Sequence, residues 1–400
     1  MQFEEEKIFE AAFDSSSFFK LSVTSAFSED CILFLSQLSK SILKDKDARQ
    51  FPDLMTFGYF CRKANLLKFK DGQLDKDIGD TQFGRGVCLH IAPANIPMNF
   101  AYSFIMGFMS GNKNIIRLPS KRFPQIDIFL RIFEFVTNTH AFNFVKERNS
   151  FIRSDRNSQK LIDLVSKVDA LVVWGGDSTV KTFRALEKKV SCFEVYFPDR
   201  VSSFLINCDF LIDESADNIL KLCENFYNDT YLVDQNACSS PSMILWYSKN
   251  DNHLLARTIF SNYLNKTLEK KYEMESISRI EKDIDVMRYC NLVDGSVELD
   301  KYSDVLWYMD SPGFKLLKPK LGVFISKNIA DLELLPSFFR DNEQTLTYYG
   351  FDNKDILKVL LNKVPRLIDR IVPVGKALDI GFIWDGKNMI NTLSKYMDCQ

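Results

Sequence analysis

The 400-residue sequence contains only three histidines, and its nine cysteines include no Cys-x-x-Cys pair. Structural zinc sites usually take four Cys or His ligands at short spacings, so this composition argues against a bound zinc ion. The number of cysteines is odd, which fits a reducing compartment where cysteine is a small buried residue or occasionally a nucleophile. We therefore expect no metal and a cytoplasmic location.

The sequence also lacks a strong net charge and a long uninterrupted apolar run. Lys and Arg total 51 and Asp and Glu total 53, so the formal net charge is −2 and does not attract nucleic acid or anionic lipid. The most apolar long stretch, residues 86–111, contains a histidine, two prolines and two asparagines, and is costly to insert into a bilayer. The acidic start, residues 1–7, is unlike a secretory leader. We expect no nucleic-acid partner and no membrane insertion.

Apolar residues make up 46% of the chain, which is enough for more than one hydrophobic core. From about residue 84, short apolar runs alternate with amphipathic stretches. We predict strands at 86–91, 114–118, 150–153, 169–174 and 202–207, and helices at 99–109, 124–136 and 178–188. This alternation predicts parallel β-α-β units and a doubly wound α/β sheet.

The rest of the chain continues the pattern less regularly. We expect the first fifty residues to be helical and residues 273–325 to be irregular. Beyond residue 208 we predict helices at 213–226 and 253–271, a polar loop at 228–240 and a strand at 243–247. The expected division is a first domain of residues 1–207, to which 366–400 return, and a second domain of residues 208–365.

Asn95 lies between two prolines in the run His90-Ile-Ala-Pro-Ala-Asn-Ile-Pro-Met-Asn99, where a predicted strand ends and a helix begins. Ligands of open α/β sheets bind at that edge. The Asn95 amide could stabilise a developing oxyanion, which favours a catalytic role. An Asx-type turn between the strand and the helix explains the same residue, and the local sequence leaves both interpretations open.

Basic and hydroxyl side chains end the next predicted strand, in the run Asn114-Ile-Ile-Arg-Leu-Pro-Ser-Lys121. Arg117, Ser120 and Lys121 suit a phosphate or a ribose at the carboxyl end of a strand. If a nicotinamide cofactor binds here, Lys121 favours the 2′-phosphate of NADP. A solvated, positively charged loop is the alternative.

Two adjacent glycines follow a third predicted strand, in the run Asp169-Ala-Leu-Val-Val-Trp-Gly-Gly-Asp-Ser-Thr179. The N-terminus of the following helix is a candidate anion site, which makes Gly175, Gly176 and Ser178 candidate cofactor residues. The run does not match the Gly-x-Gly-x-x-Gly fingerprint, which appears nowhere in the chain. A tight turn alone would explain the two glycines.

Cys238 lies in the small polar run Asp234-Gln-Asn-Ala-Cys-Ser-Ser-Pro241, directly before a predicted strand. A thiolate nucleophile needs exposure, nearby donors and little steric cover, which this setting offers. A structural role is the alternative, because most cysteines in such a chain are structural. We expect the other eight cysteines to be inert, and His90 to be a hydrogen-bonded core residue rather than a base.

Taken together in this order and spacing, these runs resemble the acyl-CoA reductases of the aldehyde dehydrogenase superfamily, and most closely the LuxC-type reductase component of bacterial fatty-acid reductase. The tail contributes Asp369-Arg-Ile-Val-Pro-Val-Gly-Lys-Ala377 and Trp384-Asp-Gly386 to the resemblance, which covers roughly residues 50–398. Several spaced motifs together are far more specific than any one of them.

The resemblance implies an aldehyde dehydrogenase-like fold, with a Rossmann-like NADP-binding lobe and an α/β catalytic lobe that carries Cys238. It implies NADPH-dependent reduction of a fatty acyl thioester, either acyl-CoA or acyl-protein, to a fatty aldehyde through an S-acyl-cysteine intermediate. An acyl-protein synthetase is the partner that the family suggests, and a homo-oligomer is an open possibility.

The resemblance also assigns roles residue by residue. Cys238 matches the nucleophile, and Asn95 matches the amide of the oxyanion hole. The remaining matched residues belong to the cofactor: Arg117, Ser120 and Lys121 at the strand end that meets the adenosine ribose, and Gly175, Gly176 and Ser178 at the turn beside the pyrophosphate.

Two departures from hydrolytic aldehyde dehydrogenases are informative. Their general-base Glu, in a Glu-Leu-Gly-Gly-Lys run, is matched here by Tyr196 in Tyr196-Phe-Pro-Asp-Arg200. Their Glu that holds the nicotinamide ribose has no counterpart, because residues 311–325 contain no Glu. Without a base to activate water, an acyl-enzyme would wait for hydride or for a thiol, which suits thioester reduction.

Two other functions remain open at this point. A thiol acyltransferase or acyl-carrying subunit would use Cys238 without hydride transfer, and would become acylated without oxidising NADPH. A non-catalytic subunit that supports an acyl-activating partner would show neither acylation nor turnover.

Overall fold

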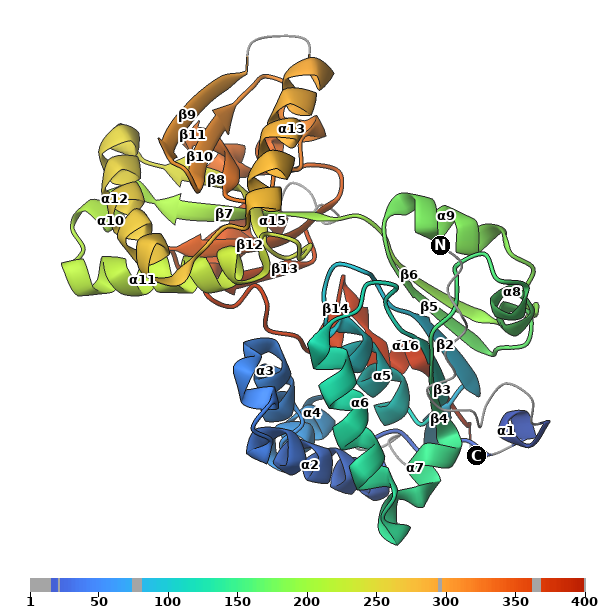
Figure 1. Ribbon diagram of the computed structural model, residues 1–400. Coiled ribbons are helices and arrows are strands. Elements are labelled where there is room, and N and C mark those ends of the chain that lie inside the picture. The colour runs from blue at the N-terminus through green and yellow to red at the C-terminus, as the bar shows by residue number, and fades with distance from the viewer. Residues whose placement is uncertain (1–15, 21, 74–80, 294–296, 362–367, 399–400) are drawn as a thin grey trace. The chain divides into compact units, whose positions relative to one another are not determined.

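The computed structural model of the chain describes residues 16–20, 22–73, 81–293, 297–361 and 368–398 (Figure 1). They form two compact units: the first holds the chain up to Pro198 and the tail from Ile380, and the second runs from Asp199 to Asp379. The start of the predicted helical N-terminal segment, residues 1–15, lies outside the described residues. No helix in the described ranges is both long enough and apolar enough to cross a membrane.

The first unit is built on a parallel sheet with the strand order β4-β3-β2-β5-β6. In chain order its strands are β2 (Val87–Ile91), β3 (Lys113–Arg117), β4 (Asn149–Ile152), β5 (Ala170–Trp174) and β6 (Phe193–Phe197). The first four are buried along their whole length. Near-continuous apolar runs are typical of parallel strands covered on both faces, so this sheet confirms the predicted β-α-β pattern.

Helices cover both faces of the first sheet. One face packs against α1 (Ser16–Lys20), α8 (Gln159–Val165) and α9 (Asp177–Ala185). The other face packs against a larger group: α2 (Glu29–Lys44), α3 (Pro52–Phe60), α4 (Lys63–Gln73), α5 (Asn99–Met109), α6 (Pro124–Thr137), α7 (Asn143–Arg148) and α16 (Met389–Leu393).

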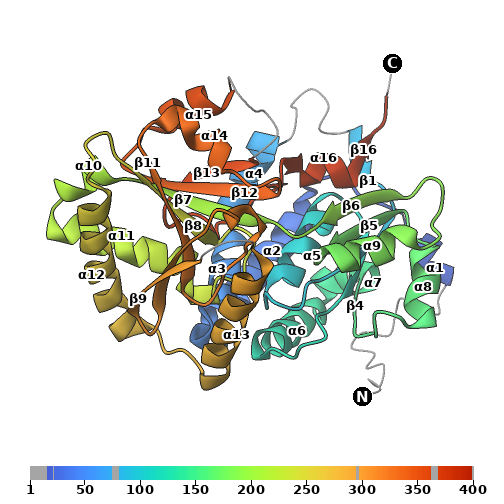
Figure 2. The same ribbon diagram turned by 90° about the horizontal axis from the view of Figure 1, so that it is seen from above.

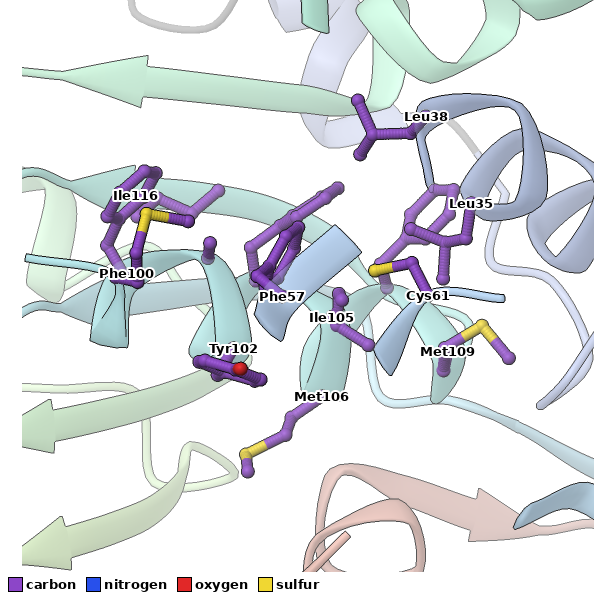
Figure 3. Close-up of a cluster of buried hydrophobic side chains, with 14 of the residues drawn as sticks. Leu35, Leu38, Phe57, Cys61, Phe100, Tyr102, Ile105, Met106, Met109 and Ile116 are labelled. Atoms are coloured by element: carbon purple, nitrogen blue, oxygen red, sulfur yellow. The ribbon is translucent and has the colours of Figure 1, made fainter. Parts of the chain in front are cut away.

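Helix α5 lies at the centre of this larger core. Ten of its eleven residues are buried, among them Phe100, Phe104 and Phe108. Figure 3 shows side chains of α5 gathered with those of α2, α3 and β3. Much of the phenylalanine content of the chain is used here, because edge-to-face ring pairs such as Phe100–Phe129 fill the space between the helices.

The tail completes the first unit. The last described strand, β16 (Ser394–Tyr396), pairs antiparallel with β1 (Gln82–Gly84), and β14 (Ile383–Trp384) forms a hairpin with β15 (Lys387–Asn388). The amide of Asn112 donates to the carbonyl of Leu393 at 2.7 Å. The returning segment of the compact unit begins at Ile380, whereas residue 366 was the predicted start.

The second unit is built on a seven-stranded sheet with the order β13-β12-β7-β8-β11-β10-β9. Only β9 runs antiparallel to its neighbour. The strands are β7 (Val201–Asn207), β8 (Pro241–Tyr247), β9 (Glu298–Ser303), β10 (Leu306–Asp310), β11 (Val323–Ile329), β12 (Glu343–Tyr349) and β13 (Arg370–Pro373). Strand β7, which the sequence analysis assigned to the first domain, pairs with β8 and β12 and therefore belongs to this sheet.

Helices also cover both faces of the second sheet (Figure 2). One face carries α10 (Cys208–Ile212), α11 (Ala216–Asp229) and α12 (His253–Lys271). The other carries α13 (Ser276–Leu292), α14 (Leu335–Phe338) and α15 (Asn353–Leu361).

The predicted elements agree with the structure to different degrees. Helices α5 and α12 have the predicted bounds, and most predicted strands agree to within one or two residues. The expectation that residues 273–325 are irregular was wrong, because this stretch contains α13 and the strands β9 to β11. Strand β6 was not predicted, since its mixed Phe-Glu-Val-Tyr-Phe pattern follows a charged turn and does not form a continuous apolar run.

Candidate active site

Cys238 lies in the short loop that leads into β8, and its side chain is partly exposed. The hydroxyl of Ser202, at the start of β7, donates to the main-chain carbonyl of Cys238 at 2.7 Å. The Ser202 hydroxyl itself accepts a hydrogen bond from the N–H of Thr345 at 3.2 Å. The backbone of Cys238 is thus tied to two neighbouring strands while its thiol stays at the surface of the unit.

Gln235 anchors the same loop from inside. Its side chain is buried, its amide N–H group donates to the carbonyl of Pro241 at 3.0 Å, and its amide oxygen accepts from the N–H of Gly322 at 2.6 Å. Both Asp234 and Gln235 have positive φ, at 50° and 54°. Such left-handed backbone is uncommon outside glycine, so the buried amide compensates for a strained turn next to the cysteine. The local sequence of this run does not indicate the anchoring role of Gln235.

A buried ion pair lies beneath this loop. Arg340 and Glu343 are almost completely buried, and the Arg340 Nε lies 3.0 Å from the Glu343 carboxylate. Arg340 also donates to the Ser242 hydroxyl at 2.9 Å and to the Ser202 carbonyl at 3.0 Å. The pair therefore holds the first residues of β7 and β8, which are the two strands that flank the Cys238 loop.

The other described cysteines lie in different surroundings. Burial raises the pKa of Cys31 and Cys192 to about 11 and that of Cys208 and Cys223 to about 12. Burial also raises the pKa of Cys61 and Cys88 well above the ordinary value. A protonated thiol is a poor nucleophile, so these side chains are suited to packing. Cys290 is exposed, and Cys399 lies outside the described residues.

Asn95 belongs to the first unit, in the turn between β2 and α5, and its side chain is exposed. Just before this turn, the N–H of Ala92 donates to the carbonyl of Arg117 at 3.1 Å, so the end of β2 is still joined to β3. Just after it, the buried side-chain oxygen of Asn99 has no hydrogen-bond partner among the described residues. Asn95 therefore follows the carboxyl end of a central strand, as the sequence predicts.

Arg117, Ser120 and Lys121 differ sharply in exposure. The guanidinium of Arg117 is buried, donating to the carbonyl of Ser154 at 3.0 Å and to the hydroxyl of Ser120 at 2.8 Å. Burial lowers the pKa of Arg117. Ser120 and Lys121 are exposed, and the Lys121 ammonium lies over the ring of Phe123 at 5.1 Å. Arg117 thus orders the loop, while Ser120 and Lys121 face solvent.

Gly175 and Gly176 join β5 to α9. A Cβ at Gly175 would lie 3.0 Å from the side chain of Thr179, and the N–H of Gly175 donates to the carbonyl of Phe197 at 3.2 Å. Gly176 is the N-cap of α9 and supplies no side chain to its first N–H groups. Ser178 is exposed in the first turn, next to the acidic Asp177. Because β2, β3 and β5 are parallel neighbours, Asn95, Arg117 and this turn lie at the same edge of the sheet.

His90 is a buried member of a neutral hydrogen-bond network, as expected. The indole N–H of Trp174 donates to the Ser103 hydroxyl at 2.9 Å, which lies 2.8 Å from the His90 Nδ1. The His90 Nε2 lies 3.1 Å from the side-chain oxygen of Asn114, whose NH₂ group donates to Asn149. This arrangement places the imidazole proton on Nε2. Burial lowers the pKa of His90 to about 4, so the ring is neutral near pH 7.

Tyr196 lies on the edge strand β6, and its hydroxyl donates to the carboxylate of Glu194. Burial, together with this hydrogen bond and the nearby negative charge, raises the pKa of Tyr196 far above its ordinary value. The phenol stays protonated at neutral pH. Tyr196 is therefore unsuited to act as a general base that activates water.

No group of three or more His, Cys, Asp or Glu side chains that could hold a metal ion occurs within the described ranges. In the second unit, the candidate nucleophile and the side chains that support it lie in or next to the Cys238 loop. In the first unit, the candidate cofactor and oxyanion residues lie at the carboxyl edge of the sheet.

Comparisons with known proteins identify relatives of the chain at the levels of sequence and fold. The sequence profile of the acyl-CoA reductase (LuxC) family matches residues 68–291, which is more than half of the chain and includes Cys238. A search of curated protein sequences finds no match.

Solved structures match nearly the whole chain. A lactaldehyde dehydrogenase matches with a TM-score of 0.64 and 11% identity, covering 95% of this chain and 87% of that one. A propionaldehyde dehydrogenase from Rhodopseudomonas palustris with bound propionyl-CoA matches with a TM-score of 0.56 and 14% identity, covering 97% and 92%.

Proline utilization A from Corynebacterium freiburgense matches with a TM-score of 0.66 and 12% identity over 96% of this chain. The chain spans only 43% of the length of that much longer protein. At such low identities these likenesses show the fold alone, and they confirm the predicted α/β fold of the aldehyde dehydrogenase type.

Proposed function

Because the chain belongs to the acyl-CoA reductase (LuxC) family, we propose that it reduces a fatty acyl thioester to a fatty aldehyde with NADPH, through an S-acyl intermediate on Cys238. The family match over residues 68–291 carries this proposal, since it includes the partly exposed Cys238 and its supporting loop. The acyl donor is acyl-CoA or an acyl-protein, and an acyl-protein synthetase is the partner proposed to supply it. The proposed compartment is the cytoplasm, because the eight described cysteines form no disulfide with one another.

In the proposed mechanism, the thiolate of Cys238 attacks the carbonyl carbon of the thioester, and the donor leaves as a thiolate that takes up a proton from solvent. The amide of Asn95 and the N–H of Cys238 donate hydrogen bonds to the oxygen while it carries negative charge. Loss of one such donor typically raises the barrier by roughly 3–4 kcal/mol. The buried anchors of the loop, Gln235 and Ser202, keep the Cys238 backbone in place during the attack.

The carboxyl edge of the first sheet fits a dinucleotide phosphate. Gly175 and Gly176 place no side chain directly before α9, and the exposed Lys121 offers a cation for a 2′-phosphate. Asp177 opposes an anion at the same turn. When bound, NADPH supplies the hydride that converts the acyl group to an aldehyde. In this proposal Arg117 acts through Ser120 and the loop it orders, because its own guanidinium is bonded inward.

The protonated Tyr196 supports reduction over hydrolysis. Tyr196 stands at the position matched to the general base of hydrolytic relatives, and its hydroxyl donates a hydrogen bond to the Glu194 carboxylate. An acyl group on Cys238 therefore persists until it meets hydride or a second thiol.

The test is NADPH absorbance decay with acyl-CoAs of increasing chain length, with the wild type and Cys238→Ala. We expect decay with the wild type and at least about a thousandfold lower rate in Cys238→Ala, because the covalent step is lost. Cys290→Ala, which removes another exposed thiol, is the matched control and should keep the wild-type rate. The ratio of the rates with NADPH and NADH measures the preference for the 2′-phosphate that is assigned to Lys121.

The outcomes separate the proposed functions. Retained acylation of Cys238→Ala would refute the nucleophile assignment. Acylation of the wild type on Cys238 without NADPH oxidation would instead support an acyl-transfer protein. Neither acylation nor turnover with acyl-CoA or acyl-protein donors would support a non-catalytic subunit.

A further inference from the structure

Helix α13 is fixed to the second sheet by one face only. Lys282 and Val286 are buried on that face. The Lys282 ammonium donates to the carbonyl of Asp304 at 2.7 Å and lies over the ring of Trp307 at 4.1 Å. These contacts define the rotation of the helix about its own axis, so the residues on its opposite side point to solvent.

The opposite side of α13 is apolar. Ile277, Ile280, Ile284 and Met287 each expose between 42% and 65% of their surface. Their spacing of three, four and three residues places them in one line along the helix, in the pattern of the seam between two paired helices. Isolated exposed apolar side chains are ordinary, but a continuous line of four marks an interaction surface. We refer to these four residues as the α13 stripe.

We propose that the α13 stripe binds the α13 stripe of a second copy of this chain, with the two helices parallel and related by a two-fold axis. In this pairing each stripe residue meets its own equivalent, so an isoleucine meets an isoleucine in three successive layers. The same patch serves both partners, as a two-fold interface requires.

The charges beside the stripe favour this occupant. Asp283 and Arg288 are both exposed and flank the stripe on opposite sides. In a parallel pair, a residue on one flank faces the residue five positions later on the other helix, so Asp283 of each copy meets Arg288 of the other. Arg288 also lies 3.1 Å from Asp285 of its own helix. Antiparallel helices would instead bring the two Asp283 side chains together.

The first experiment is sedimentation velocity of the full chain over a wide concentration range. We expect a reversible monomer–dimer equilibrium. Ile284→Asp, which places a charge in the centre of the stripe, should raise the dissociation constant at least about a hundredfold. Leu254→Asp changes an apolar residue on α12 that is even more exposed, at 68% against 42% for Ile284, and is the control, with no expected change. Circular dichroism should be unchanged, because both positions face solvent.

A charge exchange tests the orientation. Asp283→Arg should weaken the dimer, and adding Arg288→Asp should restore it to within about threefold of the wild type, because the attractive pairs reform with reversed sign. Glu281→Gln should have no effect in a parallel pair. A wild type that stays monomeric, or a dimer that Ile284→Asp leaves intact, overturns the proposal. Tighter association of Asp283→Asn indicates antiparallel helices and overturns the parallel arrangement.

Discussion

Two buried polar networks, one in each unit, are stabilised in different ways. Under the first sheet the network of His90, Ser103, Trp174 and Asn114 is neutral throughout. In the second unit the network beside the Cys238 loop is ionic, with Arg340 paired to Glu343.

This difference predicts how much stability each unit loses when one member of its network is substituted. A neutral network loses about one hydrogen bond when one member is removed, with a cost near 1–3 kcal/mol if a donor stays unsatisfied. A buried ion pair that loses one partner retains a full charge in a low-dielectric interior, which costs more. The region under the Cys238 loop is therefore the more sensitive of the two.

The largest expected effect comes from breaking the ion pair. Arg340→Met leaves the Glu343 carboxylate buried without its partner, and should lower the free energy of unfolding by about 3–5 kcal/mol. Denaturant unfolding followed by circular dichroism measures this loss. The double variant Arg340→Met with Glu343→Gln removes both charges and should recover at least half of it. A single variant as stable as the wild type would contradict the ionic description.

An intermediate effect is expected from the pH dependence of His90. The native ring is neutral with a pKa of about 4, whereas an unfolded histidine titrates near its ordinary value of 6.5. The unfolded chain therefore binds a proton between these values that the native chain does not, so stability falls as the pH drops below 6.5. Between pH 7 and 4.5, the wild type should lose roughly 2–3 kcal/mol more than His90→Gln.

Denaturant titrations of both proteins at several pH values provide the measurement. The difference between the two curves isolates His90 from the carboxylates that titrate in the same range. Parallel curves for the two proteins would show that the imidazole is not held neutral.

The smallest effect is expected from a substitution that tests how closely α5 packs against the neutral His90 network. A Cβ at Gly107 of α5 would lie 2.1 Å from the side-chain oxygen of Asn114 and 2.7 Å from the His90 Nε2. Gly107→Ala should therefore lower the free energy of unfolding by about 1–3 kcal/mol, despite the better helix propensity of alanine. Gly72→Ala in α4 is the control, because nothing lies within 4 Å of its Cβ. Equal stability of both variants would mean that α5 can move away from the sheet.

Much of the fold is predictable from local pattern because the strands are buried on both faces. Strand β5 is an uninterrupted apolar run, β2 is apolar except for His90, and α5 and α12 begin and end at the predicted residues. Strand β9 and helix α13 are among the elements that local pattern does not predict, for physical reasons. Edge strand β9 is largely exposed and charged, and α13 carries apolar residues on its outer side as well as its inner side, which obscures its period.

The candidate site was predictable in position but not in its supports. Asn95 and Gly175 follow strands, and Cys238 precedes one, so strand prediction alone locates them. The contacts of Gln235 with Gly322 and of Ser202 with Cys238 depend on the strand order β7-β8-β11, which no local pattern encodes. The sequence likewise did not predict that the Arg117 guanidinium donates to the Ser154 carbonyl, because a basic residue at a strand end can bind either a ligand or a loop carbonyl.

The returning tail has a consequence for biosynthesis. A ribosome releases a chain from its N-terminus, and domains usually fold in that order. Here β1 obtains its partner strand, and Asn112 its acceptor at Leu393, only after every residue of the second unit has been made. The part of the molecule that is synthesised first is therefore completed last. A nascent chain that has just reached Asp379 contains every residue of the second unit, whereas its first unit still lacks its final strand.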